Sequence, residues 1–295
     1  MDALLLSAGY GKRLRPITHE IPKPLLPIVD RKLIDINIEK LLSQGVERIY
    51  INLYHRADKL SAYLKGRRNI KWAIEERLSG TGGALLNFCS VLKRDFLYHS
   101  GDVISAINIQ RLLKFHLKKN GIATLALLKN PGTNFIELDG YRIRKIDAVS
   151  HRSYYTFSGI AIFSPRIFTY LPAKKKFSIA EVFERIIKNG EALWGLSMSM
   201  DWYNINTHRA YWKIHYDILK RKKNLFGNKI KGPMYIAPSS NVASRKFSGF
   251  VSIADNCYIH KDVKLKNVIV LPGTEVENGN FKDCIIGNRF CIRAR

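Results

Sequence analysis

Short apolar runs alternate with segments of helical periodicity along the first part of the chain. The run ALLLSA at 3–8 is apolar almost throughout, which is typical of a strand buried in a sheet. In the segment 31–45, apolar residues recur at helical spacing and the pattern ends at Gly45, so we expect a helix there. The segment ERIYINLY at 47–54 then predicts a second strand. Together these three segments predict a βαβ unit.

The same alternation continues as far as residue 224. Further strands are predicted at 70–76, 96–102, 123–129 and 158–164, and further helices at 82–93, 107–120, 178–189 and 211–224. Strands that alternate with helices favour an α/β fold, in which a mostly parallel sheet carries helices on both faces.

The periodicity changes after a segment at about 225–234, in which Gly, Lys and Pro interrupt every apolar pattern. Beyond it, VSIADN, YIHKDV and VLPGTE place an aliphatic or aromatic residue roughly every six positions, with turn-forming residues between them. Such repeats stack short strands into a parallel β-helix, and we expect a short left-handed one of about three coils. A β-hairpin cap is the alternative. The sequence thus predicts two domains, at 1–224 and 235–295, joined by a linker.

The composition excludes a wholly disordered, collagenous or fibrous protein, and the charge and apolar runs bear on the expected partners. The chain has 295 residues, of which 46% are hydrophobic and 25% charged, values close to those of ordinary globular proteins. Lys and Arg number 49 against 24 Asp and Glu, which gives a formal net charge of +25. These basic residues are spread along the whole chain and no nucleic-acid-binding motif accompanies them, so we expect no nucleic acid partner. No apolar run approaches the ~18 residues of a membrane helix and no signal peptide is recognisable, so we expect a cytoplasmic protein with no membrane partner.

A glycine-rich turn with several cations follows the first predicted strand. In SAGYGKRLRPITHEIPKPLLPI, residues 7–28, Gly9 and Gly11 leave room for a phosphate chain to approach the backbone. Backbone N–H groups and mobile cations together are suited to bind a polyphosphate. The cations of this segment are Lys12, Arg13 and Lys23.

This stretch resembles the signature of the nucleoside-diphosphate-sugar pyrophosphorylases, or sugar-1-phosphate nucleotidyltransferases, in the order G-x-G-x-R-L-x-P-x-T followed by P-K-P-L. The resemblance continues in four later segments. EERLSGTGGAL at 75–85 resembles the family's base-binding loop, SGD at 100–102 its metal aspartate, FSGIAIF at 157–163 its sugar-binding strand and DWYNINTHRAY at 201–211 its second metal motif. The resemblance implies a Rossmann-like sheet, and Mg²⁺ as the cofactor.

Within this family the chain is similar to more than one group. NPG at 130–132 and TFSGI at 156–160 are most similar to the N-acetylmuramate-1-phosphate uridylyltransferases, whereas a C-terminal β-helix is more usual in mannose-1-phosphate and heptose-1-phosphate guanylyltransferases. The family's reaction is attack of a sugar-1-phosphate on the α-phosphorus of a nucleoside triphosphate, with release of pyrophosphate. The resemblance therefore implies guanylyl or uridylyl transfer, for precursors of cell-envelope polysaccharides.

The resemblance also assigns roles within the first loop. Arg13 would hold the leaving β- and γ-phosphates and Lys23 the α-phosphate, where negative charge builds during the exchange. Together with Asp102 they are the expected catalytic residues. The other expected nucleotide contacts in this loop come from Ala8, Gly9, Gly11 and Lys12.

Metal binding is expected at two of the motifs. Asp102 follows a predicted strand, at the edge where open α/β sheets bind ligands, and its carboxylate suits Mg²⁺. A helix N-cap is its alternative role. At the second motif the family usually has Asp-x-Gly-Thr, whereas this chain has Asn204 in the first position, and an uncharged amide should bind Mg²⁺ more weakly. The change leaves a second hypothesis open, a regulatory subunit that binds nucleotide sugar without turnover.

A second glycine-rich loop is the expected site of the base. Glu75 or Glu76 is suited to accept both N1–H and the exocyclic amine of guanine, which slightly favours guanine over uracil. Both glutamates are equally well explained as surface charges at a strand end. The small residues that would leave room for a flat ring are Gly80, Thr81, Gly82 and Gly83.

Ser158 and Gly159 are expected to face the sugar, with Asn134 where similar enzymes usually have a glycine. The family's Glu-Lys-Pro segment, whose lysine contacts the sugar phosphate, is not recognisable. Arg152 or a lysine of 174–176 is a candidate replacement, although a solvated loop explains the run KKKF better. We also expect a homo-oligomer formed through the β-helix, whose open edges a second subunit can cover.

Overall fold

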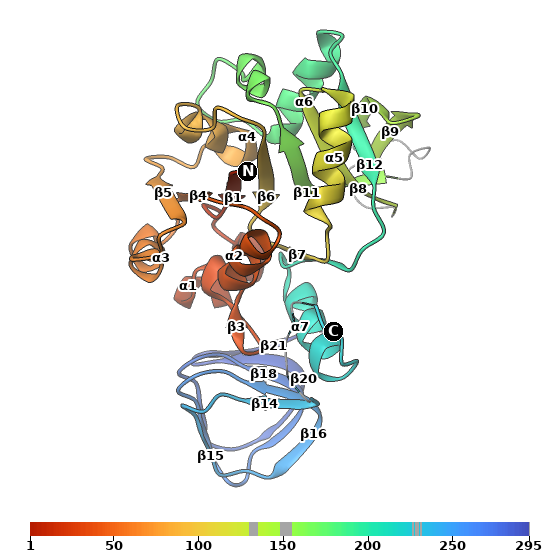
Figure 1. Cartoon of the computed structure of the whole chain (residues 1–295). Helices are drawn as coiled ribbons and strands as arrows, with labels where there is room; N and C mark the ends of the chain where they lie inside the picture. Colours follow the sequence, from red (N-terminus) through yellow and green to blue (C-terminus); the bar gives the residue numbers. More distant parts are fainter. Residues whose placement is uncertain (130–134, 148–154, 226, 228–229, 231, 295) are drawn as a thin grey trace. The chain divides into compact units, whose positions relative to one another are not determined.

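The computed structural model describes the chain from residue 1 to residue 294, apart from residues 130–134, 148–154, 226, 228–229 and 231 (Figure 1). Among the residues it describes, no helix has both the length and the apolar character needed to span a lipid bilayer.

The chain divides into two compact units, each built from two separate stretches of sequence. Unit 1 contains Met1–Gly9 and Asn37–Trp202, and unit 2 contains Tyr10–Ile36 and Tyr203–Arg295. The chain passes between the units within α2 (Leu33–Ser43) and within β13 (Trp202–Asn204). The predicted domain boundary at about 225–234 stays a prediction.

Unit 1, as far as the structure describes it, is built around a nine-stranded sheet. β1 runs parallel to β4 and β6, whereas β11 runs antiparallel to β6 and β8. The sheet is therefore mixed, and the expectation of a mostly parallel sheet is wrong, because a buried apolar run fits a strand of either direction. The strand order is β5 (Ile70–Ile74), β4 (Ile49–Leu53), β1 (Ala3–Leu6), β6 (Phe96–Ser100), β11 (Tyr155–Phe163), β8 (Ala123–Lys129), β12 (Leu193–Ser197), β10 (Arg142–Asp147) and β9 (Phe135–Asp139).

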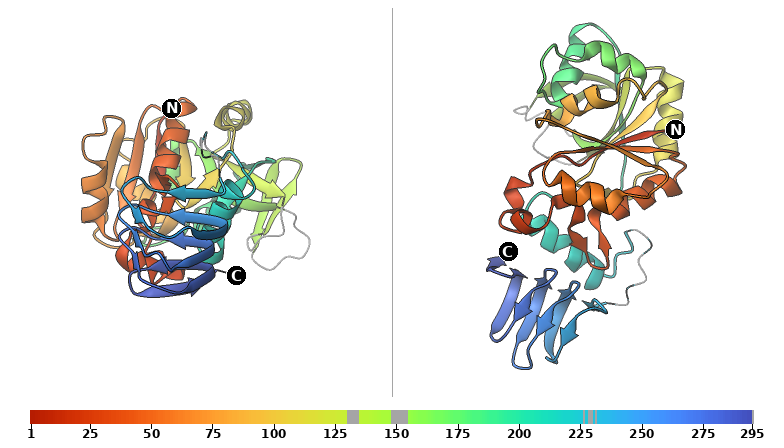
Figure 2. Two further views of the ribbon diagram at one scale, coloured as in Figure 1. Left: turned by 90° about the horizontal axis from the view of Figure 1, so that it is seen from below. Right: turned by 90° about the vertical axis from the view of Figure 1, so that its left-hand side faces the viewer.

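Helices cover both faces of this sheet, as predicted (Figure 2). The Thr124 hydroxyl of β8 lies 2.9 Å from Nδ1 of His116 in α5 (Ile109–Lys119), whereas the neighbouring Leu125 packs in one cluster with Val182 of α6 (Ile179–Lys188). Successive side chains of a strand point to opposite faces, so α5 and α6 lie on opposite sides of the sheet. The remaining elements of unit 1 include α3 (Ala57–Leu64), β7 (Val103–Ser105) and the 3₁₀ helix η4 (Pro165–Tyr170).

The helix predicted at 82–93 is largely wrong. The chain forms one short turn of helix, α4 (Gly80–Gly83), and then a 3₁₀ helix, η3 (Ala84–Phe88). Three glycines in four residues lower helix propensity there, and the apolar residues that follow reach the core from a tighter 3₁₀ turn.

The C-terminal part of unit 2 consists mainly of short parallel strands that repeat at a nearly constant interval. Its last strand, β21 (Phe290–Arg293), pairs antiparallel with the strand before it. Met234 pairs with Val251, Val251 with Val268, and Val268 with Cys284, so the register advances by one repeat at each step. Figure 2 shows these strands, in blue, stacked side by side. One sheet has the order β14 (Met234–Ile236), β16 (Lys246–Ile253), β18 (Lys264–Val270), β20 (Asn280–Gly287) and β21 (Phe290–Arg293), and the other has the order β15 (Asn241–Val242), β17 (Tyr258–Ile259) and β19 (Glu275–Val276).

Helix α7 (His208–Leu219) joins the other parts of unit 2. The Tyr211 hydroxyl donates to the carbonyl oxygen of Pro27 at 2.7 Å, and the Trp212 indole N–H donates to the carbonyl oxygen of Asn267 at 2.9 Å. One helix thus contacts both the N-terminal stretch of the unit and the C-terminal strands. The N-terminal stretch itself contains η1 (Lys12–Leu14), α1 (Ile17–Glu20), η2 (Lys23–Leu25), β2 (Pro27–Ile28) and β3 (Arg31–Lys32).

Candidate active site

The loops that follow β1 and β6 lie side by side in unit 1. Leu6 and Ser100 are paired at the ends of these parallel strands, and a Cβ atom on Gly101 would lie 2.1 Å from the carbonyl oxygen of Leu6. A Cβ atom on Gly9 would meet nothing within 4 Å. The backbone at Gly9 is therefore open to a ligand, whereas Gly101 is required by close packing.

Asp102 lies in the turn directly after Gly101 and is partly exposed. The next element is strand β7, and the N-cap of the nearest following helix, α5, is Asn108, so Asp102 does not cap a helix. Asn37 holds this turn by donating to the carbonyl oxygen of Gly101 at 3.0 Å. Burial lowers the pKa of the neighbouring His99 to about 4, and the Asp102 charge opposes that shift only in part. Asp102 is thus a carboxylate at the carboxyl end of a parallel strand, beside a neutral histidine.

Glu75 is almost fully buried, and both of its carboxylate oxygens have partners within unit 1. Oε1 accepts from Asn52 Nδ2 at 2.7 Å and Oε2 accepts from the Ser79 N–H at 2.9 Å. Asn52 in turn accepts from the Ser7 N–H at 2.9 Å, so one network links the turn after β1 to the approach to the glycine-rich loop. Glu76 is exposed. Of the two predicted base-reading carboxylates, only Glu76 is free of these buried contacts.

The glycine-rich loop packs tightly against residues 177 and 178. A Cβ atom on Gly80 would lie 2.5 Å from the carbonyl oxygen of Phe177, and one on Gly82 would lie 2.6 Å from that of Ser178. Thr81 accepts from the Ile179 N–H at 3.0 Å through its hydroxyl. Close packing of the backbone therefore requires these glycines, and the loop is a fixed wall next to the N-terminus of α6.

The predicted sugar-binding residues interrupt β11 and lie beside the turn that carries Asp102. The pairing of β11 with β8 is irregular between Phe157 and Ala161. Gly159 has φ +85°, and a Cβ atom there would lie 2.9 Å from the Ser100 hydroxyl. Unit 1 therefore brings Ser158 and Gly159 to the end of β6. Asn134 and Arg152 lie outside the described residues.

Two residues of this region were not predicted. The Trp202 indole N–H donates to the carbonyl oxygen of Ser158 at 2.9 Å, and Asn52 belongs to the Glu75 network. The signal for Asn52 was its place as one polar residue in an apolar strand, because a buried amide needs partners. Trp202 lies inside the segment 201–211, whose resemblance to the family's second metal motif points only to the metal ligand.

The cation-bearing loop belongs to unit 2. Gly11 has φ +63°, its carbonyl oxygen accepts from the Thr18 hydroxyl at 3.0 Å, and a Cβ atom there would lie 2.7 Å from the Thr18 methyl group. This turn leads into η1, which leaves Lys12 and Arg13 exposed, while Lys23 is partly buried. The loop geometry thus depends on Gly11 and Thr18, and Arg13 is available to a ligand.

The side chain of Asn204, also in unit 2, is the expected metal ligand of the second motif. Its amide oxygen Oδ1 is buried and has no hydrogen-bond partner among the residues that the structure describes. Buried polar atoms are almost always paired, so this oxygen is suited to a group that the protein alone does not supply. An amide oxygen is a good ligand for a hard cation such as Mg²⁺, and so is a carboxylate. Asn204 in unit 2 and Asp102 in unit 1 are therefore each, by their own chemistry, suited to the expected metal. Among the described residues, no group of three or more His, Cys, Asp or Glu side chains is placed to hold a metal ion.

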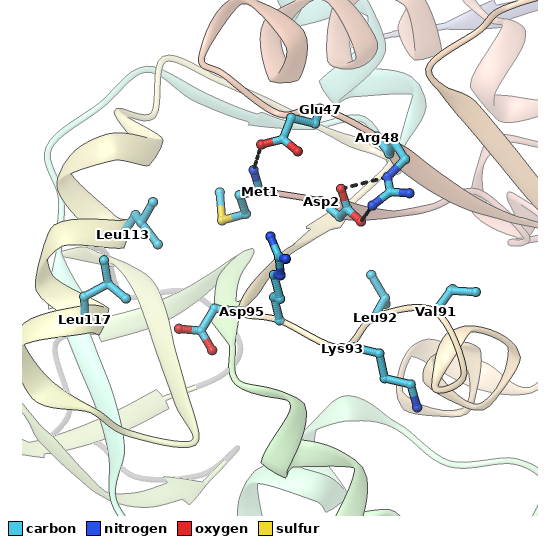
Figure 3. Close-up of a pocket in the computed structure, with 11 residues that line it drawn as sticks. Met1, Asp2, Glu47, Arg48, Val91, Leu92, Lys93, Asp95, Leu113 and Leu117 are labelled. Carbon is cyan, nitrogen blue, oxygen red and sulfur yellow. Dashed lines mark hydrogen bonds and ion pairs between the residues drawn. The ribbon is translucent and has the colours of Figure 1, made fainter.

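A separate hollow of about 490 Å³ lies at the other end of the strands of unit 1, where β1, β4 and β6 begin (Figure 3). Two ion pairs close part of its rim, between Asp2 and Arg48 and between the Met1 ammonium and Glu47. None of the predicted site residues lines it.

Comparison with known proteins gives a consistent result. The model of the family described as "Nucleotidyl transferase" matches residues 2–221. The UTP–glucose-1-phosphate uridylyltransferase of Synechocystis sp. is 24% identical over 99% of this chain and 88% of its own length. The bifunctional protein GlmU of Methanococcus maripaludis is 30% identical over 90% of this chain, which spans 62% of that protein. The crystal structure of HddC from Yersinia pseudotuberculosis complexed with GMP-PN has a TM-score of 0.62 and 22% identity, and the match covers 72% of this chain and 97% of HddC.

Proposed function

Because the chain belongs to the nucleotidyl transferase family, we propose that it joins a sugar-1-phosphate to a nucleoside triphosphate and releases pyrophosphate. The observation that carries the proposal is the signature from Gly9 to Pro24, together with Asp102 at the carboxyl end of β6. We propose guanylyl or uridylyl transfer for cell-envelope precursors. Glu76 supports guanine in particular. Its carboxylate is exposed and suited to accept N1–H and the exocyclic amine of guanine, whereas the carboxylate of Glu75 is bound internally.

The reaction needs alignment and charge neutralisation. An oxygen of the sugar-1-phosphate attacks the α-phosphorus, the bond from that phosphorus to the bridging oxygen breaks, and pyrophosphate leaves with the electron pair. No covalent intermediate with the protein is needed. We propose that Arg13 neutralises the leaving β- and γ-phosphates and that Lys23 neutralises charge on the α-phosphate. The turn at Gly9 gives the phosphates access to backbone N–H groups.

The remaining roles follow from the same motifs. We propose that Asp102 and Asn204 are the ligands of Mg²⁺, which would neutralise phosphate charge when bound. Ser158 and Gly159 would orient the sugar-1-phosphate, and Asn134 keeps its proposed role at the sugar. The other proposed nucleotide contacts are Ala8, Gly11, Lys12 and Gly80–Gly83. Glu75, whose carboxylate is bound internally, is proposed only to support the glycine-rich loop through the Ser79 N–H.

The direct test is a pyrophosphate-release assay with each nucleoside triphosphate, Mg²⁺ and a panel of sugar-1-phosphates. We expect one pair of substrates to react, and Asp102→Asn to lower kcat by about 100-fold or more, because one charged ligand is removed from the phosphates. Asp58→Asn, at an exposed carboxylate of α3, is the matched control and should leave kcat unchanged. Full activity of the Asp102 variant would contradict the assignment.

A regulatory subunit without turnover is the second candidate, and Asn204 is the observation that favours it. Replacing Asn204 by Asp restores the charge that the family usually has at this position. If the protein is an enzyme, the variant should need less Mg²⁺ for half-maximal activity. Tight nucleotide binding by calorimetry, without pyrophosphate release from either form, would favour the regulatory subunit.

We further propose that the C-terminal strands form a short left-handed β-helix and that this region joins subunits in a homo-oligomer. The nearly constant register advance from β14 to β20 supports the first part. The strand β14 supports the second, because it pairs only with β16 among the described residues and so leaves one edge open. Sedimentation at high concentration tests it, and a clean monomer would contradict it.

A further inference from the structure

Four lysines stand in register on one outer surface of the C-terminal strands. Lys246 of β16 pairs with Lys264 of β18, and Lys266 of β18 pairs with Lys282 of β20. Neighbouring strands lie about 4.8 Å apart, and residues two positions apart on a strand lie about 6.6 Å apart. The four backbone positions therefore fall within a small, flat array, which we name the lysine face.

The side chains of the lysine face point to solvent. All four lysines are exposed, whereas the residues that alternate with them, Phe247, Leu265 and Phe281, pack on the core of this region. Alternation of this kind fixes every second side chain on the same side of the sheet. The paired strands therefore present the four lysines together on the same surface.

Most of this charge is not neutralised by the protein. Lys246 is paired with Asp262, with its Nζ atom 3.1 Å from Oδ1. In the part of the chain that the structure describes, Lys264, Lys266 and Lys282 make no ion pair. Like charges directly opposite each other on neighbouring strands are destabilising, and at this spacing they lie within the screening length of about 10 Å at 0.1 M salt. An anionic partner would relieve this repulsion.

We propose that the lysine face binds the surface of a lipid bilayer that contains anionic phospholipids. A cluster of four to eight basic residues is typical of proteins that attach to such surfaces by charge. Lysine is a compact point charge that needs no fixed geometry at its partner, which suits mobile headgroups. A flat array also lets the ammonium groups of Lys264, Lys266 and Lys282 approach a planar surface at once.

A nucleic acid is the less favourable partner. The outward positions between the lysines are Ser248 and Asn280, so the face carries no aromatic ring on which a base could stack. Attachment to a bilayer surface needs no spanning helix, and so agrees with the absence of one among the described residues. It does contradict our prediction from the sequence that the protein has no membrane partner.

The test is co-sedimentation of the full chain with vesicles of phosphatidylcholine alone or with phosphatidylserine added. We expect binding only to the vesicles that contain phosphatidylserine, and loss of binding as salt rises from about 0.05 M to about 0.5 M. The variant Lys264→Gln/Lys266→Gln/Lys282→Gln should partition about 100-fold more weakly at low salt. Lys264→Arg/Lys266→Arg/Lys282→Arg keeps the charge and should bind like the wild type.

The matched control removes three positive charges elsewhere. Lys114, Lys118 and Lys188 are exposed residues of α5 and α6, and their change to Gln should leave vesicle binding nearly unchanged. An equal loss in this control would show that net charge alone is responsible and would overturn the proposal. The proposal would also be overturned if the wild-type protein did not bind vesicles that contain phosphatidylserine. It would likewise be overturned if a short nucleic acid duplex displaced the wild-type protein from the vesicles by binding to the lysine face. Pyrophosphate-release activity is measured in parallel. Because the lysine-face proposal does not rest on the proposed function, vesicle binding and enzymatic activity are tested separately.

Discussion

Single hydrogen bonds hold the residues at the edge of the unit 1 sheet. The Ser158 carbonyl oxygen is fixed by Trp202, the turn before Asp102 by Asn37, and the approach to the glycine-rich loop by Glu75. The bonds of Trp202 and Asn37 join residues that are distant in sequence, whereas the bond of Glu75 reaches only to Ser79, four residues along the chain. The positions of the residues proposed to bind substrate therefore depend on hydrogen-bond partners that need not touch the substrate.

Trp202→Phe tests this at the sugar-binding strand. The variant keeps an aromatic ring but loses the N–H that donates to Ser158. A lost hydrogen bond of about 1 kcal/mol should raise KM for the sugar-1-phosphate about fivefold, with KM for the nucleoside triphosphate nearly unchanged. Steady-state kinetics of the variant, with Trp72→Phe as the control, measures both constants. An equal rise in both constants would mean that Trp202 has only a structural role.

Gly80→Ala tests the packing of the glycine-rich loop. Both Gly80 and Gly190 have positive φ angles, +82° and +75°, but only the Cβ atom at position 80 meets backbone, at 2.5 Å from the Phe177 carbonyl oxygen. Gly190→Ala should cost about 1 to 2 kcal/mol through its backbone conformation alone. Gly80→Ala should cost about 2 kcal/mol more, because the loop or residue 177 must move. Urea denaturation of the two variants measures the difference, and equal losses would show that the contact is unimportant.

At the scale of elements, α7 determines how unit 2 is assembled. One face of the helix bonds to Pro27 through Tyr211 and His215, and His215 also lies 3.1 Å from the Ser252 hydroxyl. The neutral imidazole satisfies both of its contacts if Nε2–H donates to Pro27 and Nδ1 accepts from Ser252. Burial accordingly lowers the pKa of His215 to about 3.

This burial predicts the pH dependence of stability. In the unfolded chain a histidine titrates near pH 6.5, so below that pH the unfolded state binds a proton that folded His215 does not. The contribution of His215 is fully present above pH 6.5 and is lost as the pH falls toward 3, by at most about 1.4 kcal/mol per pH unit. Urea denaturation between about pH 7 and about pH 5 should show this fall.

His215→Gln should reduce the slope, and His19→Gln, at an exposed position, should not. Part of the slope should remain in the His215 variant, because burial also lowers the pKa of His99 and His116. A slope that His215→Gln leaves unchanged would show that His215 is accessible to protons in the folded state.

At the scale of the whole molecule, the two units are not consecutive in sequence. The stretch 10–36, which carries the cationic loop, belongs to the same unit as the C-terminal strands. Trp212 and Tyr216 of α7 pack on Phe250, with ring centroids 5.1 Å and 5.9 Å away. The C-terminal strands therefore pack directly against α7, the helix that also contacts Pro27.

Truncation after residue 224 tests this dependence. Removal of the C-terminal strands uncovers Trp212 and deletes the partner of its indole, Asn267, and one of the two partners of His215, Ser252. We expect a thermal midpoint lower by about 5 °C or more, and binding of a dye for exposed apolar surface. A truncated chain with the midpoint of the full chain would show that the first 224 residues form an independent unit, as the sequence predicts.

The amino-acid sequence determined the features that depend on neighbouring residues. The strand at 3–8, the helices at 107–120 and 178–189 and the short repeating strands after 235 all follow from local periodicity, because side-chain direction repeats along each element. The family signature from Gly9 to Pro24 is local for the same reason, since one turn supplies both the glycines and the cations.

Tertiary structure alone decided the features that depend on a distant partner. The direction of β11, the bond from Asn52 to Glu75 and the convergence of the lysine face each require residues that are far apart in the chain. A polar or charged side chain gives the same pattern in the sequence whether it meets solvent, a buried amide or another lysine. Its chemistry is set by the dielectric surroundings and the partners that folding places within hydrogen-bond distance.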